Sequence, residues 1–195
     1  MERPKERERL YERLSWLRFP EKLPPEVNAA AAPAVERLGF VPNVFRFLAL
    51  RPEHLLRWWS YYEYLMRGPS GLSRIQREMI AVVVSAVNRC HYCMISHGAA
   101  LRMLTEDPIL VDYLLTNYRH APVEPKERAM LDFAVKLTVE PYGMIEEDVE
   151  TLRRAGWSDE DILDIAQVAA MFNFTNRLAN ALGWIPNPEY HYLGR

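Results

Sequence analysis

The chain has 195 residues, of which 49% are hydrophobic and 26% are charged, as in an average soluble globular protein. Its 24 Lys and Arg residues against 26 Asp and Glu residues give a net charge of −2, which is not the basic excess typical of nucleic-acid-binding proteins. The longest apolar run in the middle of the chain, residues 79–84, is far shorter than the ~20 residues of a membrane span. The densely charged residues 1–14 contain no apolar segment of a secretory signal. We therefore expect one domain over residues 1–195, located in the cytoplasm, with neither nucleic acid nor a membrane as partner.

Helical periodicity extends over most of the chain, and no alternating strand pattern bounded by turn signals is present. The proline-rich residues 1–42 are predicted to form short helices and extended links that wrap a core. Prolines, capping side chains and glycines set the limits of the later helices. These are predicted at residues 52–66, 74–87, 93–104, 108–117, 125–140, 146–155 and 159–182. The tail, residues 186–195, is predicted to be extended or docked on a partner subunit, and the fold class is all-α.

The sharpest compositional feature is the pair Cys90 and Cys93, the only cysteines, which form a single C-x-x-C. A secreted disulfide scaffold needs several scattered pairs. One close pair in a chain without a secretory signal indicates redox chemistry or metal binding.

The surroundings of this pair predict a pocket that also contains Glu78 and His97. In one straight helix Glu78 and Cys90 would lie about 18 Å apart. The Asn-Arg dipeptide that begins at Asn88 offers a helix stop, because Asn tolerates the left-handed conformation, and a break there lets the next helix fold back. Cys90 then lies at a helix N-terminus, where unpaired amides and the helix dipole stabilise a thiolate. His97 follows Cys93 by one turn on the same face.

A carboxylate, an imidazole and two thiols suffice for a thiol peroxidase. One thiolate attacks the O–O bond and becomes a sulfenic acid, with which the second thiol condenses to a disulfide. Glu78 and His97 can move the protons. An external dithiol then reduces the Cys90–Cys93 disulfide.

The pattern Glu78-x11-Cys90-x2-Cys93-x3-His97 resembles that of the AhpD-like alkylhydroperoxidases of the carboxymuconolactone decarboxylase superfamily, in particular their peroxidase-related branch. Residues 72–104 carry the specific part of this resemblance, and residues 156–162 and 172–177 are also similar to that branch. The resemblance implies an AhpD-like helical bundle with a two-helix C-x-x-C motif. It also implies that Cys93 is the peroxidatic cysteine, that Cys90 resolves it, and that Glu78 and His97 form the proton relay.

The same resemblance implies an antioxidant peroxidase without cofactor or metal that assembles as a dimer, trimer or hexamer. Its partners would be a peroxide substrate and a dithiol electron donor, such as a lipoyl or thioredoxin-like protein. One departure concerns the relay: the best-studied members have a second histidine where this chain has Tyr92. His91, one position earlier, is expected to point elsewhere on the helix.

Other interpretations of the motif stay open at this point. Zinc could be held by the two thiols and His97 with a fourth ligand, for which the candidates are His54, His120, His191 or a distant carboxylate. The chain would then be a zinc-binding or redox-sensing interaction protein without turnover. A decarboxylase-like acid/base enzyme is a third alternative, although such enzymes lack the cysteine pair. A thioredoxin-type reductase normally has its C-x-x-C after a strand, and no strand is predicted here.

Two further patterns have structural interpretations. The aromatic residues between Trp58 and Tyr64 are expected to lie in the core or on an oligomer face. Four polar side chains recur on one side of the last long helix, and we expect them to cap backbone groups of a partner helix. They are Asn173, Asn176, Arg177 and Asn180.

Overall fold

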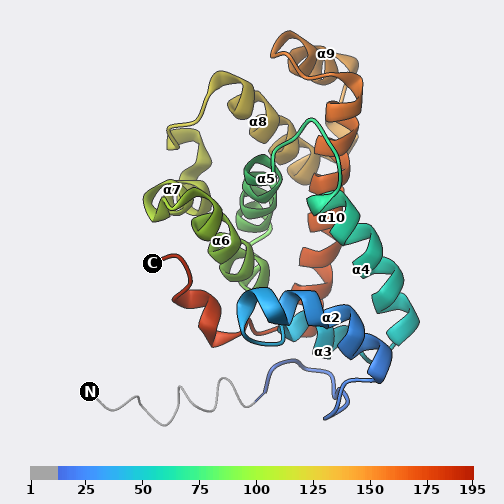
Figure 1. Ribbon diagram of the computed structural model, residues 1–195. Coiled ribbons are helices and arrows are strands. Elements are labelled where there is room, and N and C mark those ends of the chain that lie inside the picture. Colours follow the sequence, from blue (N-terminus) through green and yellow to red (C-terminus); the bar gives the residue numbers. More distant parts are fainter. Residues whose placement is uncertain (1–12) are drawn as a thin grey trace.

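The computed structural model describes residues 13–195, in which every regular element is a helix, so the predicted all-α fold class is confirmed (Figure 1). The expectations for the charged N-terminus fall mostly on residues 1–12, outside the described range. The α-helices are α2 (Pro25–Leu38), α3 (Asn43–Leu48), α4 (Pro52–Arg67), α5 (Arg74–Val87), α6 (His91–Thr105), α7 (Pro108–Asn117), α8 (Pro125–Val139), α9 (Glu146–Arg154) and α10 (Asp159–Leu182). Short 3-10 turns are η1 (Tyr118–His120), η2 (Pro141–Gly143) and η3 (Pro188–His191). Over residues 13–195, no helix combines the length and the apolar character that a bilayer crossing requires.

Helix α5 is the centre of the molecule and packs against α6, α7, α8 and α10. It begins with a capping box in which the Ser73 hydroxyl accepts from the Gln76 amide, and Gln76 bonds back to Ser73. The nine residues 77–85 are all buried, because neighbouring helices surround this part of α5 and residues 79–84 are all apolar. A buried polar residue on this helix, such as Glu78, is therefore held at a fixed position.

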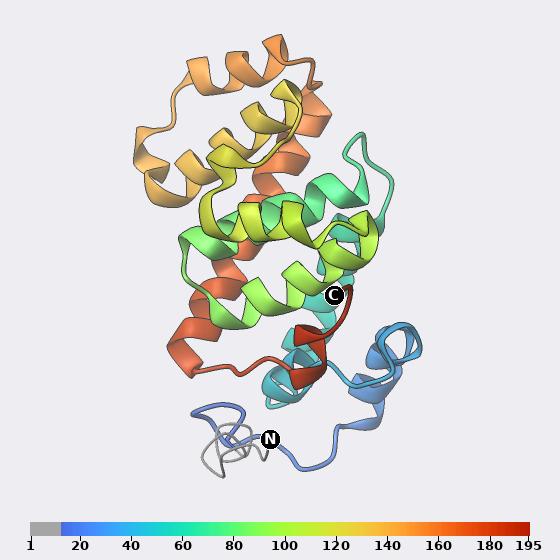
Figure 2. The ribbon, with the colours of Figure 1, turned by 90° about the vertical axis from the view of Figure 1, so that its left-hand side faces the viewer.

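The remaining helices surround α5 in two groups. Helices α2 and α3 lie at one end of the molecule with the C-terminal segment, and α8 and α9 lie at the other end (Figure 1; Figure 2). The long helix α10 runs between these ends, starting at a Ser158 capping box and stopping at Gly183 in the left-handed conformation. Helices α2, α3 and α4 share a small core of their own around Val27, Phe45 and Leu55.

The C-terminal tail differs from its prediction, because it docks on its own chain. The Asn187 side-chain oxygen accepts from the Asn43 amide at 2.7 Å. Arg102 of α6 donates to two tail carbonyls, including that of Tyr190 at 3.0 Å. These polar contacts fix the tail on its own chain with a 3-10 turn instead of an extended segment, and they place Tyr190 in the interior; docking on a partner subunit stays a prediction.

A buried arginine holds the connection between α4 and α5. Arg77 donates hydrogen bonds to the carbonyls of Leu65, Gly68 and Leu72 at 2.9–3.2 Å. Gly68 is the residue at which α4 ends, so Arg77 fixes the end of α4 against the first turn of α5. Glu78 is the next residue along the chain.

Replacing this arginine should destabilise the fold. Arg77→Met leaves three carbonyl acceptors without their donor, and we expect the free energy of unfolding to fall by about 3 kcal/mol and Tm to fall by about 6–12 °C in a chain of this size. Thermal unfolding followed by circular dichroism measures this. Arg57→Met is the control, because its surface ion pair with Glu53 is 79% exposed on the arginine side and should change stability by less than about 1 kcal/mol. Equally small losses of stability in both variants would contradict the role of Arg77 in holding the connection between α4 and α5.

Candidate active site

The site depends on a sharp break between α5 and α6. Helix α5 ends at Asn88, and the Cys90 amide donates back to the Ser85 carbonyl at 2.9 Å. The predicted break is present, but Arg89 adopts the left-handed conformation with φ of 50°, whereas Asn88 remains right-handed with φ of −77°. Asn88 is held in place because its side chain is engaged elsewhere, and the turn falls on the next residue. Helix α6 then runs back along α5.

Asparagines of α10 hold this break. The Asn88 side-chain amide donates to the oxygens of Asn173 at 2.9 Å and Asn176 at 3.0 Å. Asn180 donates to the Asn88 carbonyl at 3.0 Å and so caps the end of α5, the role expected for the stripe, whereas Asn173, Asn176 and Arg177 bond to side chains or within α10. Asn176 also donates to the Ser85 hydroxyl at 3.0 Å. The stripe therefore ties α10 to the segment that precedes the cysteines.

The two thiols have unequal electrostatic surroundings, although both are buried and free. Cys90 occupies the N-cap of α6. Its pKa is lowered, first because the Cys93 thiol donates to it; burial opposes this change, and the amides of Cys93, Asn176 and Tyr92 add to the lowering. The pKa of Cys93 is raised well above its ordinary value, because its proton is held in the bond to Cys90 and because it is buried. The first proton lost from the pair is therefore expected to leave Cys90 as the thiolate, with the other proton held between the two sulfurs.

Glu78 and His97 form a direct pair. His97 Nδ1 lies 2.7 Å from Glu78 Oε2, and both side chains are largely buried. The edge of the His97 ring packs against Phe172, with the ring centroids 4.6 Å apart. The contact orients the imidazole and leaves its other nitrogen free to point away from Glu78.

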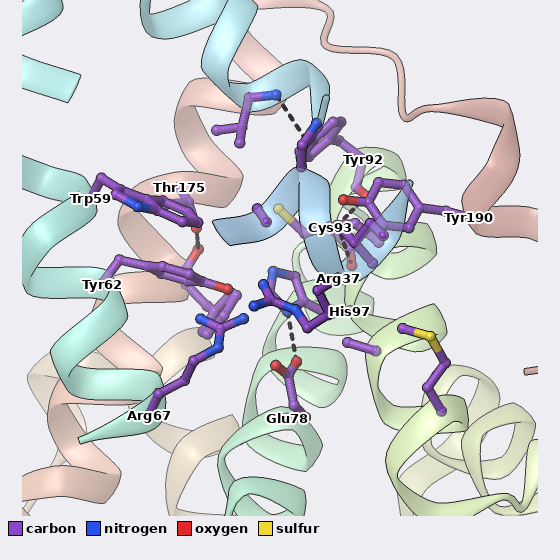
Figure 3. Close-up of a pocket in the computed structure, with 18 of the residues that line it drawn as sticks. Arg37, Trp59, Tyr62, Arg67, Glu78, Tyr92, Cys93, His97, Thr175 and Tyr190 are labelled. Carbon is purple, nitrogen blue, oxygen red and sulfur yellow. Dashed lines mark hydrogen bonds and ion pairs between the residues drawn. The ribbon is translucent and has the colours of Figure 1, made fainter. Parts of the chain in front are cut away.

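A cavity of about 290 Å³ brings the predicted site residues together (Figure 3). Cys93, Glu78 and His97 line it. Cys90 is 0% exposed and does not line this cavity, so the structure places it behind Cys93. A ligand in the cavity can therefore reach Cys93, whereas the thiol with the lowered pKa is that of Cys90.

Aromatic side chains form much of the cavity wall. The cavity is lined by Trp58, Trp59 and Tyr62 of α4. These aromatic residues, which were expected to lie in the core or on an oligomer face, thus also form part of the site. Tyr62 stacks on both tryptophans, with centroid separations of 5.2 Å. Tyr92 also lines the cavity, and its hydroxyl accepts from the Val44 amide at 3.0 Å. His91 is exposed and does not line the cavity, as expected.

The sequence analysis missed several cavity residues that come from distant segments. Tyr190 reaches the cavity from the tail, and Arg37 and Arg67 reach it from the ends of α2 and α4. No local spacing links these positions to the cysteine motif. Asn176 was noticed by its spacing, but its link to the thiols follows only from the packing of α10 on α5.

The described residues do not assemble a zinc site. Within residues 13–195, no three His, Cys, Asp or Glu side chains are grouped as metal ligands. The histidines considered as fourth ligands do not join Cys93 and His97 in the cavity lining. They are His54, His120 and His191.

The unequal thiols predict a two-step titration. In reduced protein, the ultraviolet absorbance of the thiolate should rise once below the ordinary cysteine pKa of about 8.5 and again well above it. Cys90→Ser should remove the early step, because the helix-end thiolate is lost. Cys93→Ser should retain a single early step, since the serine hydroxyl can still donate to Cys90 and the α6 amides remain. Chain unfolded in urea is the control and should titrate both thiols near the ordinary value. If both thiols of the folded wild type titrated in a single step, the unequal pKa values of Cys90 and Cys93 would be contradicted.

Comparison with known proteins places the chain in a family. The sequence model of the carboxymuconolactone decarboxylase family matches residues 52–136, which include the cysteines, Glu78 and His97. YdfG of Bacillus subtilis (strain 168), an uncharacterized protein, is 25% identical over 137 residues, covering 64% of this chain and 92% of its own length.

Two crystal structures of peroxidase-related proteins share the fold over nearly the whole chain. One from Silicibacter sp. TM1040 is 46% identical with a TM-score of 0.89, covering 93% of this chain and 96% of that one. One from Ralstonia eutropha JMP134, described as an alkylhydroperoxidase AhpD core, is 40% identical with a TM-score of 0.90, covering 94% and 97%. The chain therefore belongs to the AhpD-like, peroxidase-related proteins of the carboxymuconolactone decarboxylase superfamily.

Proposed function

We propose that this protein is a thiol-dependent peroxidase that reduces hydrogen peroxide or organic hydroperoxides through a Cys90–Cys93 disulfide cycle. The observation that carries the proposal is the single cavity in which the Cys93 thiol lies together with the hydrogen-bonded pair of Glu78 and His97. Cys90, directly behind Cys93, supplies the second thiol.

In the first step, the proton shared by the thiols moves to Cys90, which leaves the thiolate on Cys93. Cys93 attacks the peroxide oxygen, the O–O bond breaks, and a sulfenic acid and an alkoxide form. The relay of Glu78 and His97 delivers a proton to the alkoxide, which leaves as the alcohol. The peroxide is reduced by two electrons, and the sulfur of Cys93 is oxidised by the same number.

In the second step, the sulfur of Cys90 attacks the sulfenic acid of Cys93. The S–O bond breaks, the S–S bond forms, and hydroxide leaves with the proton of Cys90 as water. An external dithiol, such as a lipoyl or thioredoxin-like protein, then reduces the disulfide by exchange. Dependence on a dithiol fits a reducing compartment such as the cytoplasm, and assembly into a homo-oligomer stays a prediction.

The cysteines favour this reaction over acid/base decarboxylation, for which the family is named. Acid/base decarboxylation does not require two hydrogen-bonded thiols, one of which lines the cavity. A sensor without turnover would not need a proton donor beside the thiol, and the Glu78–His97 pair supports repeated turnover.

Steady-state reduction of tert-butyl hydroperoxide, with dihydrolipoamide as donor, tests the proposal. Cys93→Ser should abolish turnover, because the attacking sulfur is lost. Cys90→Ser should stop after one equivalent with a sulfenic acid on Cys93, which a dimedone-type probe labels. Glu78→Gln should lower kcat/KM by about 100-fold, the lower range for loss of a general acid–base group.

The matched control is Glu53→Gln, which removes one carboxylate from the exposed start of α4 and should leave kcat/KM unchanged. The proposal would be wrong if folded, reduced wild type consumed no peroxide, or if Cys93→Ser turned over like wild type. Probe labelling of Cys90 in Cys93→Ser, with turnover retained there, would reverse the roles of the thiols.

A further inference from the structure

Four polar side chains of the cavity have no part in the proposed thiol chemistry. They are the guanidinium groups of Arg37 and Arg67 and the phenol groups of Tyr62 and Tyr190, which we call the donor cluster. They come from α2, α4 and the C-terminal tail, and Figure 3 shows them around the space that Cys93 and His97 face. All four groups are hydrogen-bond donors.

The two phenol side chains are largely buried, and both line the cavity. Tyr62 is 7% exposed and Tyr190 is 6% exposed, and within residues 13–195 neither hydroxyl forms a hydrogen bond with a protein group. Neither hydroxyl oxygen is sealed from the cavity, so a ligand can reach both. Burial raises the pKa of both phenols, so they stay protonated at neutral pH and can donate to the acceptor atoms of a ligand.

The arginines add positive charge next to these hydroxyls. The charge of Arg67 opposes the rise in pKa of both Tyr62 and Tyr190, and Arg37 acts on Tyr190 in the same way, which shows that the four groups lie close together. Arg67 pairs with Glu63 through Nη1. Its Nε is buried and makes no hydrogen bond within the described chain.

The charge of the cavity lining selects the sign of the ligand. Three arginines line it, since Arg74 joins Arg37 and Arg67, whereas Glu78 is the sole carboxylate residue in the lining. Glu78 is already bonded to His97. Even with Arg67 paired to Glu63 outside the lining, the cavity keeps a net positive charge in a chain whose net charge is −2.

Building on the proposed peroxidase function, we propose that the cavity selects organic hydroperoxides that carry a carboxylate. The donor cluster binds the carboxylate, and the hydroperoxide group then faces Cys93. Planar guanidinium groups bind carboxylates with two parallel hydrogen bonds, and the phenols supply further donors. The apolar middle of the substrate packs on the aromatic wall formed by Trp58 and Trp59.

The cavity volume limits the size of this substrate. A volume of about 290 Å³ lies near the lower end of the ~300–1,000 Å³ typical of ligand pockets. This suits a small branched or aromatic hydroperoxy acid better than full enclosure of a long fatty-acid chain.

Binding of two unreactive ligands of equal shape tests the inference without relying on turnover. Isothermal titration calorimetry compares 4-isopropylbenzoate with its neutral counterpart 4-isopropylbenzamide on the full, reduced chain. We expect the carboxylate to bind at least about tenfold more tightly, as a charge-assisted hydrogen bond does over a neutral one. Arg37→Gln and Arg67→Gln should each reduce that preference severalfold, because they weaken binding of the carboxylate more than binding of the amide. Arg57→Gln, which removes an exposed charge of α4 outside the cavity, should retain it.

Equal binding of the two ligands, undetectable binding of both, or an unchanged preference in Arg37→Gln and Arg67→Gln would overturn the inference. Turnover then separates the two proposals, with cumene hydroperoxide and its 4-carboxy derivative as substrates. If wild type reduces both equally, the peroxidase function stands and carboxylate selection is wrong. If it reduces neither but binds 4-isopropylbenzoate selectively, the carboxylate site stands and the peroxidase function is wrong.

Discussion

The site of this protein depends on one constraint, the break between α5 and α6 that the asparagines of α10 hold. Asn88 is bonded on its side chain to Asn173 and Asn176 and on its carbonyl to Asn180, so the end of α5 has almost no freedom. The chain turns at Arg89 in the left-handed conformation, and α6 begins directly afterwards. A continuous helix would keep Glu78 about 18 Å from Cys90. The break instead places Glu78 beside His97 of α6.

A single reactive cysteine normally combines a lowered pKa with access to the substrate. The same break gives these two properties to different thiols. As the N-cap of α6, Cys90 gains the helix amides and a lowered pKa. Cys93, one turn later, lines the cavity and keeps the shared proton. In the proposed cycle Cys90 therefore accepts the proton that frees Cys93 for attack, and it later returns as the resolving thiol. Arginines and phenols from other segments complete the cavity around Cys93.

The fold and the inner part of the site could be predicted because their signals are local. Prolines, caps and glycines mark helix ends, and the spacing of Glu78, the cysteines and His97 lies within two neighbouring helices. Tyr190 and Arg37 could not be predicted, because they reach the cavity through tertiary packing that no periodicity records. The docking of the tail on its own chain could not be predicted, because the contact of Asn187 with Asn43 joins residues far apart in the sequence.

The central claim is that Cys93 and Cys90 act as one unit that the fold makes reactive towards peroxide. Mass spectrometry of peptides after rapid mixing of reduced protein with one equivalent of hydroperoxide tests it most directly. The account predicts an intrachain Cys90–Cys93 disulfide, which has lost two hydrogen atoms, formed much faster in the folded chain than in the same chain unfolded in urea. Equal rates in both states, or oxidation of methionines while both thiols stay reduced, would contradict it.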